Sequence, residues 1–332
     1  MSAISVPDVL HHARITGVGG YRPEQVVPNS EIIGPIDSSD AWIRERSGIE
    51  SRHRAAPDET VVDMSEHAAR AALEHAGLTA DQLDGVLVAT VTHPYQTPGA
   101  APEVAMRLGS TAAAFDISAA CAGYCHAISV ANDMVRVGTA EHVLVVGVEK
   151  MLDFTDPEDR GSAFIFGDGA GAVIVSRSTT PGIGPTVWGS DGGQQRLITQ
   201  RSSWIELRED RDLRWPAIVM EGPSVFRWAV WSMAKEAQRA LDAAGVTADD
   251  LDAFIPHQAN VRIIDQMAKA LRLPADLPVA RDIRTTANTS AASIPLAMDR
   301  MIREGEVDSG GLALQIGFGA GLVWAAQVVT IP

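Results

Sequence analysis

Cysteine is nearly absent from this chain. Only Cys121 and Cys125 occur among 332 residues, and they stand four positions apart in an apolar segment. Small secreted domains depend on a framework of many cysteines, and this chain has none. We therefore expect no structural disulfide, and a reducing, cytoplasmic location is the default.

Long apolar runs and basic residues are also scarce. No stretch approaches the ~18 consecutive apolar residues of a membrane span, and residues 1–14 lack the basic and apolar regions of a secretory signal. The 27 Lys and Arg face 42 Asp and Glu, which gives a net charge of −15. Nucleic-acid binding needs a basic footprint. We therefore expect neither nucleic acid nor membrane among the partners of what should be a globular protein.

An internal echo spans the chain. The segment AGLTADQLDG begins at Ala76, and the related segment AGVTADDLDA begins at Ala244, about half the chain length later. Each copy follows a pattern with the 3.6-residue period of an amphipathic helix and precedes an apolar run typical of a buried strand. The expected helices cover 68–76 and 233–244, and the expected strands begin at 85 and 253.

Two further correspondences keep the same order. Phe115 and Asp116 lead into Cys121 as Asp282 leads into Asn288, and a glycine-rich turn enters a strand near the end of each half. Three ordered correspondences favour a duplicated α/β architecture over chance. The expected ranges are 166–175 and 317–326 for the glycine-rich segments, 1–178 and 179–332 for the halves, 178–222 for a loop-rich stretch between them, and 205–215 for a part of it too polar for the core.

Cys121 occupies a position typical of a nucleophile. An apolar strand ends before it and an apolar helix begins at Ala122, which puts the thiol at a helix N-terminus. The helix dipole and unpaired N–H groups there favour the thiolate, so we expect a lowered pKa. Small neighbours such as Ala120 and Gly123 leave room for a substrate, as at a strand–turn–helix nucleophile elbow. The alternative is a buried structural cysteine, since Cys behaves as a small hydrophobic residue.

A metal site built from Cys121, Cys125 and His126 is not expected. Residues 121 and 125 share a helix face, but His126 points about 100° away, and no fourth ligand is evident. We expect Cys125 to pack in the core one turn below Cys121.

His257 and Asn288 are the other candidates for a functional site. His257 follows a short apolar strand in the segment IPHQAN, and α/β sheets place ligands at the carboxyl ends of strands. Asn288 stands where Cys121 stands in the first half, at a turn before an Ala/Ser-rich helix. An amide at that turn is a hydrogen-bond donor that does not ionise. The alternatives are a histidine with ordinary structural partners and a plain helix N-cap.

Together these segments resemble the β-ketoacyl-acyl-carrier-protein synthase III family, which has the thiolase fold. The resemblance covers nearly the whole chain in the family's order. It implies a five-layered α/β/α/β/α sandwich made of two duplicated βαβαβαββ halves. The matching segments are 38–49 (SSDAWIRERSGI), 114–124 (AFDISAACAGY), 159–173 (DRGSAFIFGDGAGAV), 255–260 (IPHQAN), 285–298 (TTANTSAASIPLAM) and 316–326 (IGFGAGLVWAA).

The resemblance implies a decarboxylative Claisen condensation of an acyl-CoA primer with malonyl-acyl carrier protein. Cys121 would carry the acyl group, and His257 and Asn288 would donate hydrogen bonds to the malonyl thioester carbonyl as CO2 leaves. The backbone N–H groups of Cys121 and Ala320 would form the oxyanion hole. Ala320 and Ala287 stand where relatives have glycine, which puts only the local backbone in question. The alternatives are a non-decarboxylating acyltransferase, which a carboxylate at 288 would suit better, and a starter-unit enzyme of secondary metabolism.

The same resemblance implies contacts with CoA and with the carrier protein. We expect no metal or organic cofactor, because CoA is part of the substrate, and we expect a homodimer. Thr97 lies in a loop that would close the partner's acyl pocket, and its small size would admit longer or branched primers. The implied CoA and pantetheine contacts are Trp42, Arg46, Arg160, Gly222, Phe226 and Asn260; the implied docking patch for an acidic carrier protein is Arg227, Arg262, Lys269 and Arg272. Core packing or ordinary surface charge is the alternative for these residues.

Overall fold

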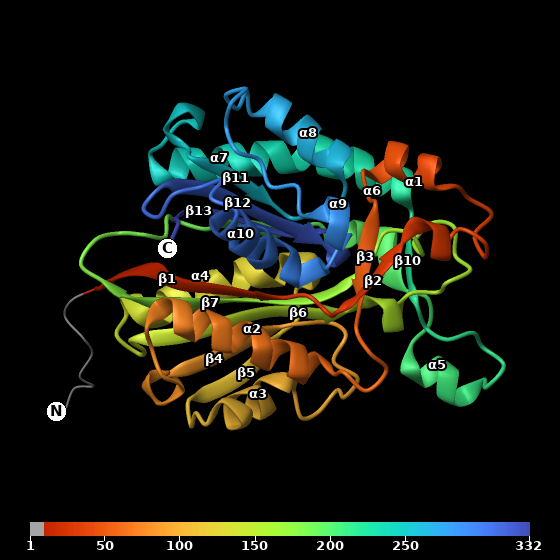
Figure 1. Cartoon of the computed structure of the whole chain (residues 1–332), viewed down its shortest axis with the longest axis horizontal. Helices are drawn as coiled ribbons and strands as arrows, with labels where there is room; N and C mark the ends of the chain where they lie inside the picture. The colour runs from red at the N-terminus through yellow and green to blue at the C-terminus, as the bar shows by residue number, and fades with distance from the viewer. Residues whose placement is uncertain (1–9) are drawn as a thin grey trace.

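Two mixed β-sheets form the frame of the molecule (Figure 1). This computed structural model describes residues 10–332. One sheet has the strand order β1-β7-β6-β4-β5, and the other has the order β11-β12-β13-β8. The first comprises β1 (His12–Tyr21), β4 (Gly85–Ala89), β5 (Ala113–Ile117), β6 (His142–Lys150) and β7 (Asp168–Ser178); the second comprises β8 (Val187–Ser190), β11 (Ala253–Pro256), β12 (Leu312–Gly319) and β13 (Val323–Thr330).

Helices cover both faces of each sheet, which confirms the expected five layers. One pair packs on the outer face of the first sheet, a second pair lies between the sheets, and a third covers the outer face of the second sheet (Figure 1). In that order the pairs are α2 (Val61–Ala76) with α3 (Ala100–Leu108), α4 (Gly123–Arg136) with α10 (Ser293–Arg303), and α7 (Ala234–Ala244) with α8 (Val261–Ala270).

The two sheets repeat one topology. In the first, β4 pairs parallel with β5 and β6, and β6 pairs antiparallel with β7. In the second, β11 pairs parallel with β12, and β12 pairs antiparallel with β13. The counterpart of β5 is reduced to a single parallel bridge between Phe254 and Val279. The second half therefore keeps the βαβαβαββ order with its third strand reduced to that bridge.

Helix caps explain the echo in the sequence. Gly77 and Gly245 end α2 and α7 in the left-handed conformation, with φ of 67° and 71°, a region that favours glycine. Thr79 and Thr247 then begin short 3₁₀ turns with capping boxes. The repeated letters AG and T therefore mark a helix stop and a turn start in both halves.

The stretch 178–222 has more structure than the sequence indicated. It contains three short strands and a helix, and β9 pairs with β10 beside the second sheet. The part too polar for the core, residues 205–215, does lie outside it: Ile205 and Trp215 are 59% and 57% exposed, in the projecting segment around α5 (Figure 1). The remaining elements are β2 (Gln25–Pro28), α1 (Asp40–Ser47), β3 (Ser51–Arg54), β9 (Ile198–Gln200), α5 (Trp204–Glu209), β10 (Ile218–Met220), α6 (Gly222–Trp228) and α9 (Ile283–Thr286).

Within residues 10–332, no helix has both the length and the apolar character to cross a bilayer.

Candidate active site

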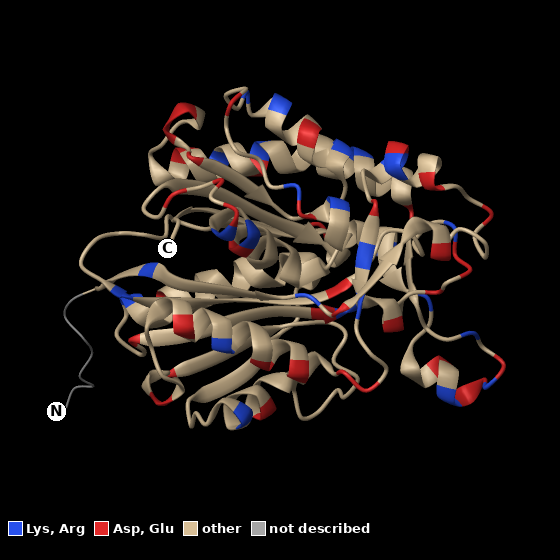
Figure 2. Cartoon of the chain, viewed as in Figure 1, with Lys and Arg blue, Asp and Glu red and all other residues tan. Residues whose placement is uncertain are grey.

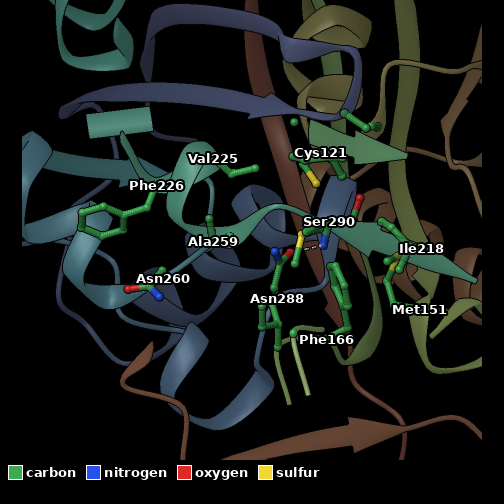
Figure 3. Close-up of a pocket in the computed structure, with 18 of the residues that line it drawn as sticks. Cys121, Met151, Phe166, Ile218, Val225, Phe226, Ala259, Asn260, Asn288 and Ser290 are labelled. Atoms are coloured by element: carbon green, nitrogen blue, oxygen red, sulfur yellow. Dashed lines mark hydrogen bonds between the residues drawn. The ribbon is translucent and has the colours of Figure 1, made fainter. Parts of the chain in front are cut away.

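A cavity of about 470 Å³ opens between the two halves. Cys121, His257 and Asn288 all line it, although 167 residues separate the first from the last. Figure 3 shows Cys121 and Asn288 on opposite sides of Ser290 in this cavity. The fold therefore brings a thiol, an imidazole and an amide to one enclosed space.

The turn that carries Cys121 has the expected elbow geometry. β5 ends at Ile117, a 3₁₀ turn covers Ala120–Ala122, and α4 follows directly. Ala120 adopts a φ of 48° just before the thiol, a conformation that L residues rarely take. Gly319 passes so close that a Cβ built there would lie 3.1 Å from the Cys121 Sγ. The strained turn and the glycine at the end of β12 therefore hold the sulfur at the cavity wall.

The expected low pKa of this thiol is wrong for the unacylated protein. Cys121 keeps part of its surface open to the cavity but lies deep among protein atoms, and this burial raises its pKa to about 12. The nearby Glu149 carboxyl raises the pKa further, while the Ser290 hydroxyl lowers it. The cost of burying a charge therefore outweighs the effect of the helix N-terminus on the pKa of this thiol.

Hydrogen bonds hold the ring of His257 and suit one neutral tautomer. Its Nδ1 lies 2.7 Å from the Ser293 Oγ, and the Gln258 backbone N–H donates to that same oxygen at 3.3 Å. The Ser293 hydroxyl is then free to donate to Nδ1, which leaves the ring proton on Nε2. Burial lowers the His257 pKa to about 3. His257 therefore presents a neutral ring with an N–H donor.

Asn288 is held by contacts from both halves. Its backbone N–H donates to the Ile165 carbonyl at 2.9 Å, and its carbonyl accepts from the Gly167 N–H at 3.1 Å. Its side-chain Oδ1 accepts from the Ser290 backbone N–H at 2.8 Å (Figure 3). With the oxygen occupied, the amide NH2 is the group left to donate. Two N–H donors, from His257 and Asn288, therefore line the same cavity as the Cys121 sulfur.

The two alanines that replace glycine behave differently. Ala320 lines the cavity beside Gly319, and its φ is not positive, so alanine fits there without strain. Ala287 has φ 57° and ψ −161°, a region essentially restricted to glycine. The turn before Asn288 is therefore strained in this protein.

The mouth of the cavity carries an aromatic ring between two cations. The Arg46 and Arg160 guanidinium carbons lie 5.8 Å and 5.5 Å from the Trp42 ring centroid, within cation–π range. Asn260 caps α8 through the Arg262 N–H and donates to the Arg46 carbonyl at 3.0 Å, which ties α8 to α1. A planar base and its phosphates suit such a mouth.

The predicted residues fall into two groups. Those that line the cavity are Cys121, His257, Asn288, Ala320, Trp42, Arg46, Gly222, Phe226 and Asn260. Arg160 contacts Trp42 but does not line the cavity. Thr97 is exposed and lies outside this cavity in its own chain.

The four predicted docking residues lie on or next to α6 and α8, and one of them contacts a residue that lines the cavity. All are exposed, and the Arg262 guanidinium stacks 5.4 Å from the ring of Phe226, which lines the cavity. Figure 2 shows basic residues along α8 with an acidic one among them. These residues are Arg227 on α6, Arg262 and Lys269 on α8, and Arg272 just after α8.

Sequence reasoning missed the apolar end of the cavity. Met151, Phe166 and Ile218 form a separate buried cluster and appear together beyond Cys121 in Figure 3. Ile218 comes from β10, in the stretch that the sequence marked as loop-rich. Short apolar triplets within that stretch, such as AIV at 217–219, were the only available signal.

Glu149 and Ser290 were missed as well. Glu149 is fully buried, and its carboxyl receives a hydrogen bond from the Ser290 hydroxyl at 3.1 Å. The signal was present, since Glu149 follows the apolar run VLVVGV in a strand buried on both faces. An acid in such a position needs a reason.

No cluster of three or more His, Cys, Asp or Glu suited to a metal ion occurs within residues 10–332. Cys125 is fully buried in the core between the sheets, as expected, and His126 stacks on Trp188 with ring centroids 5.7 Å apart.

Known proteins have sequences similar to this one. The family profile described as 3-oxoacyl-[acyl-carrier-protein (ACP)] synthase III matches residues 115–192, and its C-terminal counterpart matches 241–331. The β-ketoacyl-[acyl-carrier-protein] synthase III of Streptomyces glaucescens is 59% identical over 333 residues, with 100% of both chains covered. The mycobacterial β-ketoacyl-[acyl-carrier-protein] synthase III of Mycobacterium marinum is 50% identical over 100% of this chain and 99% of its own.

Solved structures share the fold. The priming β-ketosynthase from the R1128 polyketide biosynthetic pathway superposes with a TM-score of 0.97 at 48% identity, over 100% of this chain and 99% of its own. The 3-oxoacyl-[acyl-carrier-protein] synthase III from Aquifex aeolicus VF5 gives 0.89 at 38% identity, over 96% and 99%. With two relatives at 50% identity or more over the full length, this chain belongs to the β-ketoacyl-[acyl-carrier-protein] synthase III family of condensing acyltransferases.

Proposed function

We propose that this enzyme condenses an acyl-CoA primer with malonyl-acyl carrier protein through an acyl-Cys121 intermediate, with loss of CO2. The observation that carries the proposal is the single cavity lined by one thiol and two neutral N–H donors. The names of the relatives support the reaction, and the cavity supplies groups for each of its steps.

The donors suit decarboxylation. As CO2 leaves, negative charge develops on the malonyl thioester oxygen, and His257 and Asn288 donate to it. Loss of one such donor typically costs ~3 kcal/mol of transition-state stabilisation. The carbanion then attacks the acyl-Cys121 carbonyl, whose oxygen is held by the backbone N–H groups of Cys121 and Ala320.

The apolar end of the cavity would receive the primer. Met151, Phe166 and Ile218 form its floor beyond the sulfur, and burial of a primer there contributes about 0.8 kcal/mol per CH2. The opposite end would hold CoA, with its adenine against Trp42 and its phosphates near Arg46 and Arg160. CoA enters as part of the substrate, and the reaction requires no metal or organic cofactor.

The exposed cations on α6 and α8 would dock the acidic carrier protein. Arg262 stacks on Phe226, which lines the cavity, and Arg227, Lys269 and Arg272 extend the positive charge along α6 and past the end of α8. Opposite charges accelerate such encounters. The reaction would take place in the cytoplasm, where free thiols such as those of Cys121 persist.

The enzyme would act as a homodimer. β5 is the edge strand of its sheet, and Phe115 on it is 44% exposed. Met106 on α3, which contacts β5, and Tyr95 in the loop after β4 are 64% and 69% exposed. An apolar exposed edge is a template for pairing with another strand. Pairing of β5 with its copy would bring Thr97 of each chain toward the partner's primer pocket. Light scattering of the purified protein tests the dimer.

Priming of a polyketide chain is a second candidate. It is favoured by the high similarity to a priming ketosynthase over the whole chain. Condensation rates with a fatty-acid carrier protein and a polyketide carrier protein, measured side by side, separate the two pathways.

The reaction is tested by CO2 release from labelled malonyl-acyl carrier protein in the presence of acyl-CoA. We expect CO2 and an acyl adduct on Cys121 by mass spectrometry, and Cys121→Ala should abolish both. Asn288→Asp should still acylate but should lose decarboxylation. An Asn288→Asp enzyme that cannot be acylated would show that the assigned roles are wrong, and no CO2 above the Cys121→Ala level would favour a non-decarboxylating acyltransferase.

A further inference from the structure

Glu149 is a buried acid beside the thiol. It lies on β6 and is 0% exposed. Its Oε2 accepts three hydrogen bonds, from the Thr90 hydroxyl at 3.1 Å, the Val91 N–H at 3.1 Å and the Thr92 hydroxyl at 2.6 Å. All of these donors are neutral. The carboxyl is therefore anchored by one oxygen and keeps the other for a different partner.

That partner is Ser290. Its hydroxyl donates to the Glu149 Oε1 at 3.1 Å. Its turn packs against the turn of Cys121, both residues line the cavity, and its hydroxyl lowers the pKa of the thiol. The Ser290 backbone has a φ of 49° and is held by the bond from its N–H to the Asn288 Oδ1. Figure 3 shows Ser290 between Cys121 and Asn288. A continuous chain of polar groups therefore leads from the sulfur into the protein.

Burial makes the thiol hard to ionise, so a proton acceptor linked to it would assist its reaction. Its pKa is raised to about 12 by burial, while burial lowers the pKa of His257 to about 3, which makes His257 a poor proton acceptor. Glu149 forms no ion pair with a cation of residues 10–332, and burial raises its pKa to about 7. A group with a pKa near the working pH is the most effective acceptor.

We propose that Ser290 and Glu149 form the proton path that activates Cys121 for acylation. The proposal rests on the acyl-Cys121 reaction proposed above. As the sulfur attacks the acyl-CoA carbonyl, the thiol proton passes to the Ser290 Oγ, and the hydroxyl proton of Ser290 passes to the Glu149 Oε1. The new S–C bond forms, the C–S bond to CoA breaks, and the path returns the proton to the departing CoA thiolate. Glu149 ends as it began, and it acts through Ser290 as a positioning residue.

The surroundings of Glu149 leave this path undisturbed. Lys150, the next residue on β6, directs its Nζ to two backbone carbonyls and to Asp153 at 3.2 Å. Asp168 on β7 accepts from two backbone N–H groups. The segment after β4 and the 3₁₀ turn at 290–292 present hydroxyl and amide groups to Glu149. Of the titratable groups on these elements and on the Cys121 turn, Cys121 is the one that Ser290 connects to Glu149.

The test separates the two half-reactions. Acylation is followed by rapid quench and intact mass between pH 5.5 and 9, and condensation is followed in a single turnover of preloaded acyl-enzyme with malonyl-acyl carrier protein. We expect wild-type acylation to rise with pH through about 7, as Glu149 loses its proton. Glu149→Gln and Ser290→Ala should acylate about 100-fold more slowly, and Glu149→Gln should lose the inflection. Condensation by the preloaded variants should stay within about threefold of wild type.

The control is Asp168→Asn, which removes a buried carboxyl from the neighbouring strand and leaves the path intact; its acylation should keep the wild-type pH profile. Equal losses in both half-reactions would make Glu149 a structural residue and overturn the proposal, as would wild-type acylation by Glu149→Gln. If Glu149→Gln does not fold, Ser290→Ala decides the question by the same criteria. A wild-type enzyme that accepts no acyl group would instead refute the proposed function, and the path with it.

Discussion

Replacement of Gly319 by alanine should slow acylation because the added methyl group would collide with Cys121. A Cβ built at this position lies 2.9 Å from both the Cβ and the backbone N of Cys121, and 3.1 Å from its Sγ. Carbon atoms pack at about 3.5–4.0 Å, so the elbow or the end of β12 must move by roughly 0.6–1 Å. Gly319 has an extended backbone with φ −176°, which alanine adopts freely. The effect is therefore steric and aimed at the nucleophile.

A 1 Å displacement of a reacting group costs about 100-fold in rate, or about 2.7 kcal/mol. We expect Gly319→Ala to slow acyl transfer to Cys121 by about that factor, with a loss of about 1–3 kcal/mol in unfolding free energy from overpacking. Rapid-quench mass spectrometry measures the first quantity and urea denaturation the second. Gly192→Ala is the matched control, because a Cβ there meets no heavy atom within 4 Å. Acylation by Gly319→Ala within threefold of this control would refute the reasoning.

Three further predictions concern strain, charge and the primer. Ala287→Gly should relieve ~2 kcal/mol of backbone strain, which offsets the lost methyl group and the added entropy of the unfolded chain. Its unfolding free energy, measured in urea, should therefore change by less than ~1 kcal/mol. The control Ala297→Gly in α10 should lose about 1–2 kcal/mol, and equal losses in the two variants would contradict strain at Ala287. The raised Glu149 pKa of about 7 means that the folded state binds the proton more tightly than the unfolded state. Stability from this group is therefore present below about pH 4.5 and is lost as pH rises through 7. Relative to Glu149→Gln, wild type should gain on the order of 3 kcal/mol of unfolding free energy between pH 8 and 5, and the same pH dependence of unfolding in both proteins would contradict the raised pKa. Ile218→Trp should keep acetyl transfer but reduce transfer of four- and five-carbon primers at least ~10-fold, as measured by mass spectrometry. Val219 does not line the cavity, so Val219→Trp should leave the range of accepted primers unchanged. An unchanged range in Ile218→Trp would show that Ile218 does not contact the primer.

Much of the site was predictable because its signals are local. The elbow at Cys121 and the turn at Asn288 each follow from a strand end, small residues and a helix start within one short segment. His257 likewise follows a four-residue apolar strand. The duplicated pattern of helix stops and capping boxes then fixed where the halves repeat, since caps depend on neighbouring residues only.

The pKa of Cys121 and the apolar end of the cavity were not predictable in this way. The helix N-terminus is visible in the sequence and argued for a low pKa, but the desolvation that outweighs it comes from segments far along the chain. Ile218 lies on a strand of three residues that pairs with β9, and three residues are too few to show a strand pattern in the sequence. Ser290 was inside a recognised motif, yet its partner Glu149 lies 141 positions away.

The sequence by itself determined the repeated helix–strand pattern and the turns that carry Cys121 and Asn288, because these depend on periodicity, capping and residue chemistry over a few positions. The five layers and the roles of Cys121, His257 and Asn288 were implied by the family resemblance. Only the tertiary structure decided which groups surround the sulfur, how far burial raises or lowers each pKa, and that the buried acid Glu149 is joined to Ser290. Desolvation and hydrogen bonding depend on atoms brought together across both halves of the chain, and no local pattern encodes those distances.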